Sequence, residues 1–273
     1  MFSNVDNFSI IYIIMKKGKF IHSTRLLNCY KKGQLDNIMK KFNQQINEQT
    51  FLGAGDDAST FIYDDDQMMK ISTKQSRYFI EFKSKKAGQF KDHINEFLPY
   101  FLPVNEILYE DKNTFIYTQY KCKKIKKENI TKKEVMTIYN LVRLMFQRNC
   151  IVTDIGPHNI GVNQHYDQPF LFDYHSLQPI FIEGKISSEV NLNRISRNLT
   201  QFMAFIYAPH KIEEYMESMK KSEEKAIKKI EKDHLLPECL IVLIKYLINE
   251  KKFKKNKIID LIDRCIDHLS NLD

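Results

Sequence analysis

Tryptophan is absent from this 273-residue sequence, and cysteine is scarce. The five cysteines, at positions 29, 122, 150, 239 and 265, are odd in number and form no CxxC pair. This spacing gives neither a disulfide framework nor a zinc-binding pattern, so we expect a reducing compartment. The missing Trp together with abundant Lys, Asn and Ile is typical of an AT-rich genome, such as that of a parasite or a large DNA virus.

Long apolar runs are also lacking. The early apolar segment from Phe8 to Met15 is too short to span a bilayer, and no basic region precedes it as a signal peptide requires. We therefore expect a cytoplasmic protein without a membrane partner, located in the host cytoplasm or the virion if its source is viral.

The composition is that of an ordinary globular protein, with 43% hydrophobic and 28% charged residues. Lys and Arg number 42 against 34 Asp and Glu, which gives a net charge of +8. A basic surface attracts ATP, acidic proteins, nucleic acid and anionic lipid alike, so charge alone selects no partner. The Lys runs at 123–127 and 251–257 are typical of solvated surface and give no further indication of nucleic-acid binding.

The pattern of apolar residues predicts an α+β protein whose first half is mainly strands. A hairpin with a turn at Gly18 and an amphipathic helix over 34–47 form an N-terminal extension, residues 1–49, that we expect to pack on a small lobe. In that lobe, residues 50–121, a long helix over about 75–98 accompanies five antiparallel strands. The strands are expected from Thr50 and at 59–63, 68–72, 104–109 and 114–120.

The second half, residues 122–273, is predicted to be a helical lobe. Thr131 and Glu134 form a capping-box pattern that begins a helix reaching about Arg148. A loop and hairpin over 149–175 follow. Further helices are expected near 188–207, 210–232, 236–251 and 256–270.

The predicted hairpin carries the polar residues that indicate chemistry. Asp154 and Asn159 lie five residues apart before one apolar strand, and Asp173 follows the next strand. A hairpin folded here brings Asn159 and Asp173 together at its open end. An amide and a carboxylate oxygen presented together suit magnesium held jointly with phosphates, and Asp154 is close enough to accept a proton. This is a layout for phosphoryl transfer.

The D-x4-N pattern, the apolar strand and the second Asp resemble the catalytic and metal-binding loops of the protein-kinase-like superfamily. The resemblance implies a two-lobed kinase-like fold that binds ATP and Mg²⁺. It makes Asp154 the catalytic base, Asn159 and Asp173 the metal ligands, and Lys70, in Met68-Met69-Lys70-Ile71, the lysine that pairs with the α- and β-phosphates.

The nucleotide-binding residues follow from the same resemblance. The segment from Leu52 to Ser59 is similar to the Gly-rich loop, and Thr118-Gln119-Tyr120 occupies the place of the gatekeeper and hinge. The backbone of Gln119 and Lys121 would then hold adenine. Glu81 is the first choice for the glutamate that pairs with the lysine, and Glu96 is the alternative. The expected nucleotide-binding residues are thus Leu52, Gly53, Gly55, Ala58, Lys70, Glu81, Thr118, Gln119 and Lys121.

Several positions depart from the family pattern. Asp56 and Asp57 put negative charge in the Gly-rich loop, where they oppose anion binding unless they point outward. Val152 and Thr153 replace the His-Arg before the catalytic Asp, so switching through an activation-loop phosphate is not expected. Gly156 occupies a position where Ser/Thr protein kinases carry Lys, His175 replaces the Gly of Asp-Phe-Gly, and no Ala-Pro-Glu motif follows.

These features predict a kinase, most simply a divergent serine/threonine protein kinase that transfers the γ-phosphate of ATP to a protein hydroxyl. One alternative is a small-molecule kinase similar to the aminoglycoside and choline kinases, with a small hydroxylated acceptor. The Lys-rich C-terminal helices favour an acidic or protein substrate over a cationic one. The other alternative is a pseudokinase that keeps the fold and binds a partner. Retention of all four of Lys70, Asp154, Asn159 and Asp173 counts against it.

Overall fold

The computed structural model of the chain divides into two compact units, one of Met1–Ser84 and Leu102–Lys121, the other of Lys85–Phe101 and Cys122–Asp273. The N-terminal hairpin predicted before residue 26 lies outside the described residues. The structure describes residues 40–42, 44–47, 49–54, 58–73, 94–110, 114–151, 155–163, 165–171, 178–183, 185–187, 190–249 and 254–272.

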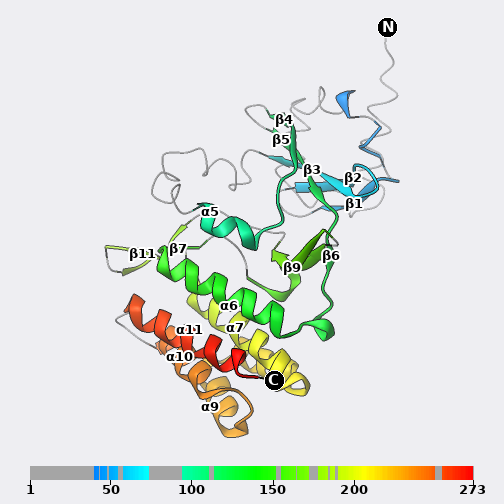
Figure 1. Cartoon of the computed structure of the whole chain (residues 1–273). Helices are drawn as coiled ribbons and strands as arrows, with labels where there is room; N and C mark the ends of the chain where they lie inside the picture. Colours follow the sequence, from blue (N-terminus) through cyan, green and yellow to red (C-terminus); the bar gives the residue numbers. More distant parts are fainter. Residues whose placement is uncertain are drawn as a thin grey trace. The chain divides into compact units, whose positions relative to one another are not determined.

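The first unit is built on a five-stranded antiparallel sheet with the order β1-β2-β3-β5-β4 (Figure 1). The turn between β2 and β3 forms because Oδ1 of Asp64 accepts hydrogen bonds from the backbone N–H groups of Asp66 and Gln67. The five strands confirm the sheet predicted from the sequence. Their bounds are Phe51–Ala54 (β1), Ala58–Ile62 (β2), Gln67–Thr73 (β3), Glu106–Glu110 (β4) and Thr114–Tyr120 (β5).

One face of this sheet carries the hydrophobic core of the first unit. Because side chains alternate along a strand, Met69 and Ile71 of β3 share this face with Ile116 of β5. The core cluster consists of Phe42, Phe61, Met69, Ile71 and Ile116. The apolar face expected for the helix over 34–47 does reach the core through Phe42. That helix ends earlier than predicted, because the described residues from 42 onward form turns held by the side chain of Asn47.

The second unit is mainly helical, as predicted. The 3₁₀ segment η3 (Leu98–Tyr100) follows α5 directly, α6 packs against α7 and α11, and α10 packs against α7, α9 and α11. Figure 1 shows α6 and α11 running alongside one another. The α-helices are α5 (Ile94–Phe97), α6 (Lys132–Gln147), α7 (Leu192–Tyr207), α8 (Ile212–Lys221), α9 (Glu223–Asp233), α10 (Glu238–Asn249) and α11 (Lys255–Ser270).

Helix α6 begins where the sequence predicts. Thr131 is its N-cap, the side chain of Glu134 accepts a hydrogen bond from the Thr131 backbone N–H at 2.7 Å, and the capping box is complete. Five apolar residues that recur at helical spacing in α6 are buried, namely Val135, Ile138, Leu141, Val142 and Met145. In α11, Leu261 is buried while Ile259 and Ile266 are half-buried.

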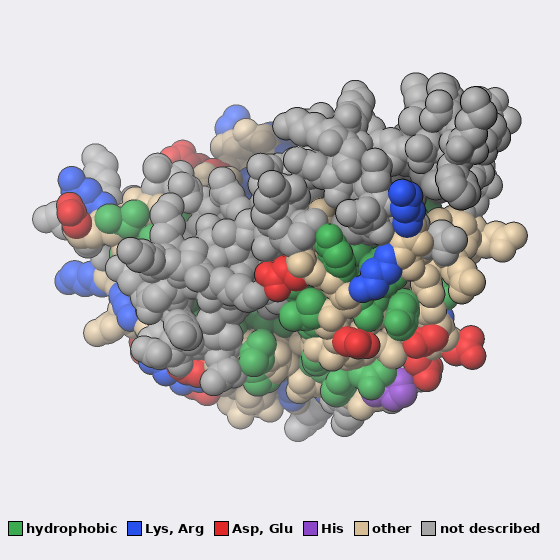
Figure 2. All heavy atoms as spheres, turned by 90° about the horizontal axis from the view of Figure 1, so that it is seen from above, with side chains coloured by type: hydrophobic (Ala, Val, Ile, Leu, Met, Phe, Trp, Pro, Cys, Tyr) green, Lys and Arg blue, Asp and Glu red, His purple; other side chains and the backbone are tan. Residues whose placement is uncertain are grey.

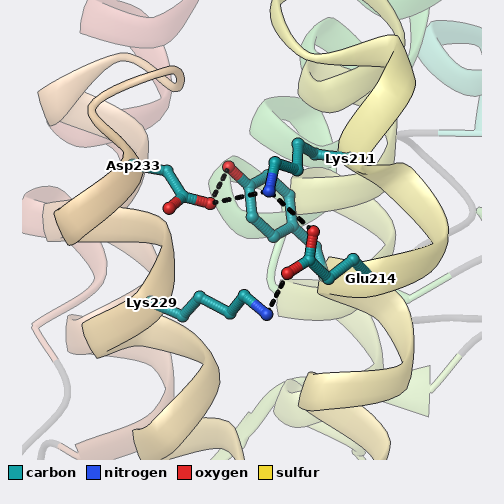
Figure 3. A network of polar contacts seen from close by, with 5 residues as sticks. Lys211, Glu214, Lys229 and Asp233 are labelled. Atoms are coloured by element: carbon teal, nitrogen blue, oxygen red, sulfur yellow. Dashed lines mark hydrogen bonds and ion pairs between the residues drawn. The ribbon is translucent and has the colours of Figure 1, made fainter.

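The single helix predicted over 210–232 is wrong. It is two helices, α8 and α9, separated at Ser222, whose extended backbone ends α8 and whose side chain caps α9. The two helices are joined by the polar contacts in Figure 3. Lys211 bonds Glu214 at 2.8 Å, Lys229 pairs with the other oxygen of Glu214, and the Tyr215 hydroxyl donates to Asp233 at 3.1 Å.

Short strands missed by the sequence analysis complete the second unit. The sheet with order β6-β8-β9 contains the predicted hairpin, which β8 and β9 form. Two further pairs are β7 with β10 and β11 with β12. The strands are β6 (Lys123–Lys124), β7 (Cys150–Ile151), β8 (Ile160–Asn163), β9 (Tyr166–Leu171), β10 (Gln178–Pro179), β11 (Phe181–Ile182) and β12 (Lys185–Ile186).

The architecture confirms the α+β class, with a small antiparallel sheet in one unit and helices dominating the other. None of the helices in the described part of the chain combines the length and apolar character needed to cross a membrane.

Candidate active site

Lys70 lies in the middle of the central strand β3, between Thr60 of β2 and Tyr117 of β5. Its neighbours Met69 and Ile71 face the core cluster, so the alternation of side chains directs Lys70 to the opposite face of the sheet. The side chain is half-buried. Strand pairing on both sides therefore fixes the backbone of Lys70 and directs its side chain to the face away from the core cluster.

The Gly-rich segment is described in part. Leu52 is exposed, Gly53 and Ala58 are half-buried, and Gly55 lies outside the described residues. Gly53 pairs with Thr60, which pairs with Lys70, so the three positions form one row across the sheet. A Cβ added to Gly53 would meet no described atom within 4 Å. Packing within the described residues thus gives no reason for glycine here, whereas a ligand that approaches the backbone would give one.

The register of β3 and β5 places Thr118 and Gln119, both predicted to bind the nucleotide, on opposite faces of the sheet. Thr118 is opposite Met69, on the core face, whereas Gln119 is opposite Met68, on the same face as Lys70. Both side chains are fully buried, and Nε2 of Gln119 donates to the carbonyl of Leu102 at 2.8 Å. The structure therefore brings Gln119, and not Thr118, to the face of Lys70.

The backbone of Lys121 already has a partner. Its N–H donates to the carbonyl of Asp66 at 2.7 Å, and its Nζ donates to the carbonyl of Asp65 at 2.7 Å. Adenine recognition through this N–H would require the hydrogen bond to Asp66 to be broken. A residue-by-residue match to the family could not reveal this, because the bond depends on how the β2–β3 turn meets the end of β5.

Asn159 is the best-defined residue of the predicted catalytic loop. It ends the 3₁₀ segment η5 (Pro157–Asn159), directly before β8, and its side chain is 4% exposed. Its backbone N–H donates to the carbonyl of Gly156 at 3.0 Å, which closes the 3₁₀ turn. Pro157 favours this turn because its ring fixes φ and it needs no backbone donor at the first position.

The β8–β9 hairpin is confirmed, and its register fixes the place of Asn159. Ile160 pairs with Leu171, so Asn159 stands at the open end of the hairpin, and Asp173 follows Leu171 by two positions in the sequence. Asp154 and Asp173 themselves lie outside the described residues. A bridge between Leu171 and Phe101 ties this end of the hairpin to the segment that follows η3.

The imidazole of His158 lies against Gly156. A Cβ on Gly156 would be 2.3 Å from Cε1 and 2.6 Å from Nδ1 of His158. Gly156 is buried while His158 is exposed. The ring thus occupies the space that a side chain at position 156 would need. Only their nearness in the sequence was available as a signal, and it does not specify the rotamer of His158.

Of the two candidate glutamates, the structure describes one. Glu96 of α5 binds Arg148, the C-cap of α6, through hydrogen bonds of 3.0 Å to Nε and 2.6 Å to Nη2. This two-point ion pair links α5 to α6 inside the second unit. Glu81 lies outside the described residues.

On the face drawn in Figure 2, the charged side chains do not favour ligands of one charge over ligands of the other. Basic, acidic and hydrophobic side chains are interspersed there, and no field of one sign covers the described part of that face.

Comparisons with known proteins find likeness among solved structures. No protein-family model matches the sequence, and no curated protein matches it. Among solved structures, that of vaccinia related kinase 3 aligns with this chain at 11% sequence identity and a TM-score of 0.46. The alignment covers 81% of this chain and 88% of the chain of that kinase.

Proposed function

We propose that this protein is an ATP-dependent phosphotransferase of the kinase type and that its acceptor is a Ser or Thr hydroxyl of a protein. The observation that carries the proposal is the buried Asn159 at the open end of the β8–β9 hairpin. Asp154 stands five residues before it, and Asp173 follows the second strand of the same hairpin. Lys70 and Gly53 in one row of the five-stranded sheet support the same reading.

The donor atoms suit magnesium with a nucleotide. The amide oxygen of Asn159 and the carboxylate of Asp173 are hard oxygen ligands, the kind that Mg²⁺ prefers, and they would hold the ion. When bound, Mg²⁺ neutralises the charge that develops on the transferred phosphoryl group.

Side chains of the protein would bind the phosphates and activate the acceptor. Lys70 would bind the α- and β-phosphates, and Gly53, beside which no atom of the described residues occupies the place of a Cβ, would allow backbone N–H groups to approach them. Asp154 would orient the acceptor hydroxyl and accept its proton.

Two observations indicate that the adenine contacts lie one residue further along the chain than the sequence predicts. Gln119 rather than Thr118 shares the face of Lys70, and the N–H of Lys121 is already bonded to Asp66. We therefore assign the gatekeeper position to Gln119 and the adenine-binding backbone groups to Tyr120 and Cys122. This assignment leaves the bond between Lys121 and Asp66 intact.

The acceptor is tested by incubating the full chain with Mg²⁺ and ATP labelled on the γ-phosphate, together with acidic and basic proteins. Label on protein Ser or Thr in the wild type, lost in Asp154→Ala, supports the proposal. Asp267→Asn, which changes an exposed aspartate of α11, is the matched control and should label as the wild type does.

A small-molecule acceptor is the second candidate, and the packing of His158 on Gly156 favours it. The lysine that protein kinases carry at position 156 has no room while the ring remains there. ATP consumption with small hydroxylated or amino compounds, but without protein labelling, would establish this reading. ATP binding without transfer to any acceptor would instead identify a pseudokinase.

A further inference from the structure

The chain before β1 contributes one side chain to the core of the first unit. Phe42 is 7% exposed and belongs to the core cluster. The other four members of the cluster lie on strands, namely Phe61 on β2, Met69 and Ile71 on β3, and Ile116 on β5. The core behind the sheet is therefore completed by a residue that does not belong to the sheet.

The described residues between Lys41 and Thr50 are tied to the sheet at both ends. Nζ of Lys41 donates a hydrogen bond to the backbone carbonyl of Leu108 in β4 at 3.5 Å. At the other end, the backbone N–H of Ile62 in β2 donates to the carbonyl of Thr50 at 2.6 Å. Because β2 and β4 lie on different sides of β3 in the sheet, these bonds hold Phe42 across the core face of β3.

Turns between the two ends fix the backbone that carries Phe42. The backbone N–H of Ile46 donates to the carbonyl of Phe42 at 2.9 Å, and the side chain of Ile46 packs against the core cluster. The side chain of Asn47 accepts hydrogen bonds from the backbone N–H groups of Gln49 and Thr50 at 2.9 and 3.0 Å. Phe42 is thus anchored both through its ring and through its backbone.

Two members of the core cluster are the neighbours of Lys70 in the chain. Met69 and Ile71 face the core, and the alternation along β3 directs Lys70 to the opposite face. Protein interiors are close-packed and transmit strain, so the position of β3 depends on what fills the space on its core face. A phenyl ring removed from a core leaves a cavity that the surroundings fill only in part, by shifting. Because Met69 and Ile71 belong to this cluster, such a shift would move the backbone of Lys70.

We propose that Phe42 is a positioning residue for phosphoryl transfer, which fills the core face of the sheet and so fixes the strand from which Lys70 reaches the nucleotide. The inference rests on the proposed function, because it concerns the role assigned there to Lys70. The core cluster and the Lys70 side chain lie on opposite faces of the sheet. Phe42 therefore acts through β3 and does not touch the nucleotide.

This role predicts the size of the effect. A catalytic group that is misplaced by about 1 Å can cost about 100-fold in rate. Pairing with β2 and β5 limits the shift of β3, so a folded Phe42→Ala variant should transfer phosphate about 10-fold more slowly than the wild type.

A double-mutant cycle separates positioning from a general loss of stability. Transfer of labelled γ-phosphate from ATP with Mg²⁺ to the acidic and basic proteins named above is measured for full-length wild type, Phe42→Ala, Lys70→Met and the double variant. Urea denaturation first establishes that each is folded under the assay conditions. If Phe42 acts through Lys70, Phe42→Ala should cost about 10-fold in the wild-type background and nothing further in Lys70→Met. An equal loss in both backgrounds would overturn the inference.

Phe42→Leu provides the same test if the alanine variant does not fold. Leucine leaves a smaller cavity, so the loss should be about threefold and should also disappear in the Lys70→Met background. Phe202→Leu is the matched control, because Phe202 is completely buried in α7 and should lose stability without losing transfer rate. Where the alanine variant does not fold, a Phe42→Leu variant as active as the wild type would overturn the inference.

The cycle also distinguishes this inference from the proposed function. An active wild type whose rate Phe42→Ala equals would contradict the role of Phe42 alone. A wild type that transfers no phosphate to any acceptor would contradict the proposed function, and the role of Phe42 would fail with it.

Discussion

At the scale of single residues, Lys70 is the proposed phosphate-binding group, and strand pairing places it on the face of the sheet away from the core cluster. Replacing Lys70 with Met removes the ammonium group and keeps most of the side-chain volume. We expect about a 100-fold loss of phosphotransfer, the typical cost of removing one group that stabilises transition-state charge. Steady-state rates with the folded variant measure it. Lys121→Met, which lies beyond the end of the same sheet, is the control, and an equal loss there would count against the special role of Lys70.

Gly53 gives a second prediction at this scale. Because a Cβ at this position meets no described atom, Gly53→Ala should change the free energy of unfolding by less than about 0.5 kcal/mol. A phosphate that approaches the backbone would meet the added methyl group, so ATP affinity should fall. Urea denaturation and nucleotide titration separate the two effects. Unchanged ATP affinity would remove Gly53 from the proposed nucleotide site.

At Gly156, unlike at Gly53, replacement by alanine should lower the stability of the fold. An alanine there collides with the imidazole of His158, so Gly156→Ala should destabilise the protein by about 1 kcal/mol. The double variant Gly156→Ala with His158→Ala should recover most of that loss, since the ring is gone. Equal unfolding free energies for the single and double variants would show that the ring simply moves aside.

At the scale of the elements, the capping box of α6 allows a direct measurement. Thr131→Ala removes the side chain that accepts from the Lys133 N–H, and it should cost about 1 kcal/mol of stability. Thr137, which lies inside the same helix and bonds the carbonyl of Lys133, is the matched control. Its replacement by Ala should cost little, because Ala is the better helix former. Urea denaturation of both variants gives the comparison.

The contacts between α8 and α9 predict a pH dependence. Hydrogen bonds from Lys211 and Lys229 lower the pKa of Glu214 to about 2, below the value of about 4.3 expected in the unfolded chain. The ionised carboxylate therefore stabilises the fold above that unfolded value. Its contribution is lost as the pH falls through about 2, because the unfolded state binds the proton more tightly.

Glu214→Gln tests this directly. The urea midpoint of the variant should lie below that of the wild type at neutral pH, and the difference should shrink as the solution is acidified below about pH 4. Glu214 is substantially exposed, so the effect should be small and reduced by salt. A difference that stays constant down to pH 2 would show that the carboxylate charge contributes nothing.

Elements with strong local signals were predictable from the sequence, and those set by distant contacts were not. The capping box of α6 and the short apolar runs of β3 and β5 depend on neighbouring residues, so their bounds were nearly correct. The break at Ser222 was missed because apolar spacing continues through it, and only the cap geometry separates α8 from α9. Two-residue strands such as β7 carry too few side chains for any pattern.

At the scale of the whole molecule, the sequence predicted one unit built mainly on a sheet and another built mainly of helices. It could do so because strand patterns prevail in the first half of the chain and helical patterns in the second. The spacing of Asn159 from Asp154 predicted a metal ligand at Asn159, which stays a prediction. The sequence could not show on which face of the sheet Thr118 lies, because that follows from the register between β3 and β5. Nor could it show that the Lys121 N–H donates a hydrogen bond to the carbonyl of Asp66.

The central claim is that Asp154 serves as the base of a Mg²⁺-dependent phosphotransferase. The most direct test measures the rate of γ-phosphate transfer from ATP for the wild type and for Asp154→Ala, with ATP affinity determined for both. The account predicts a rate about 10² to 10⁴ times lower in the variant, the usual contribution of a general base, with ATP affinity nearly unchanged. Equal rates in the two proteins, or a wild type that binds ATP and transfers nothing, would contradict it.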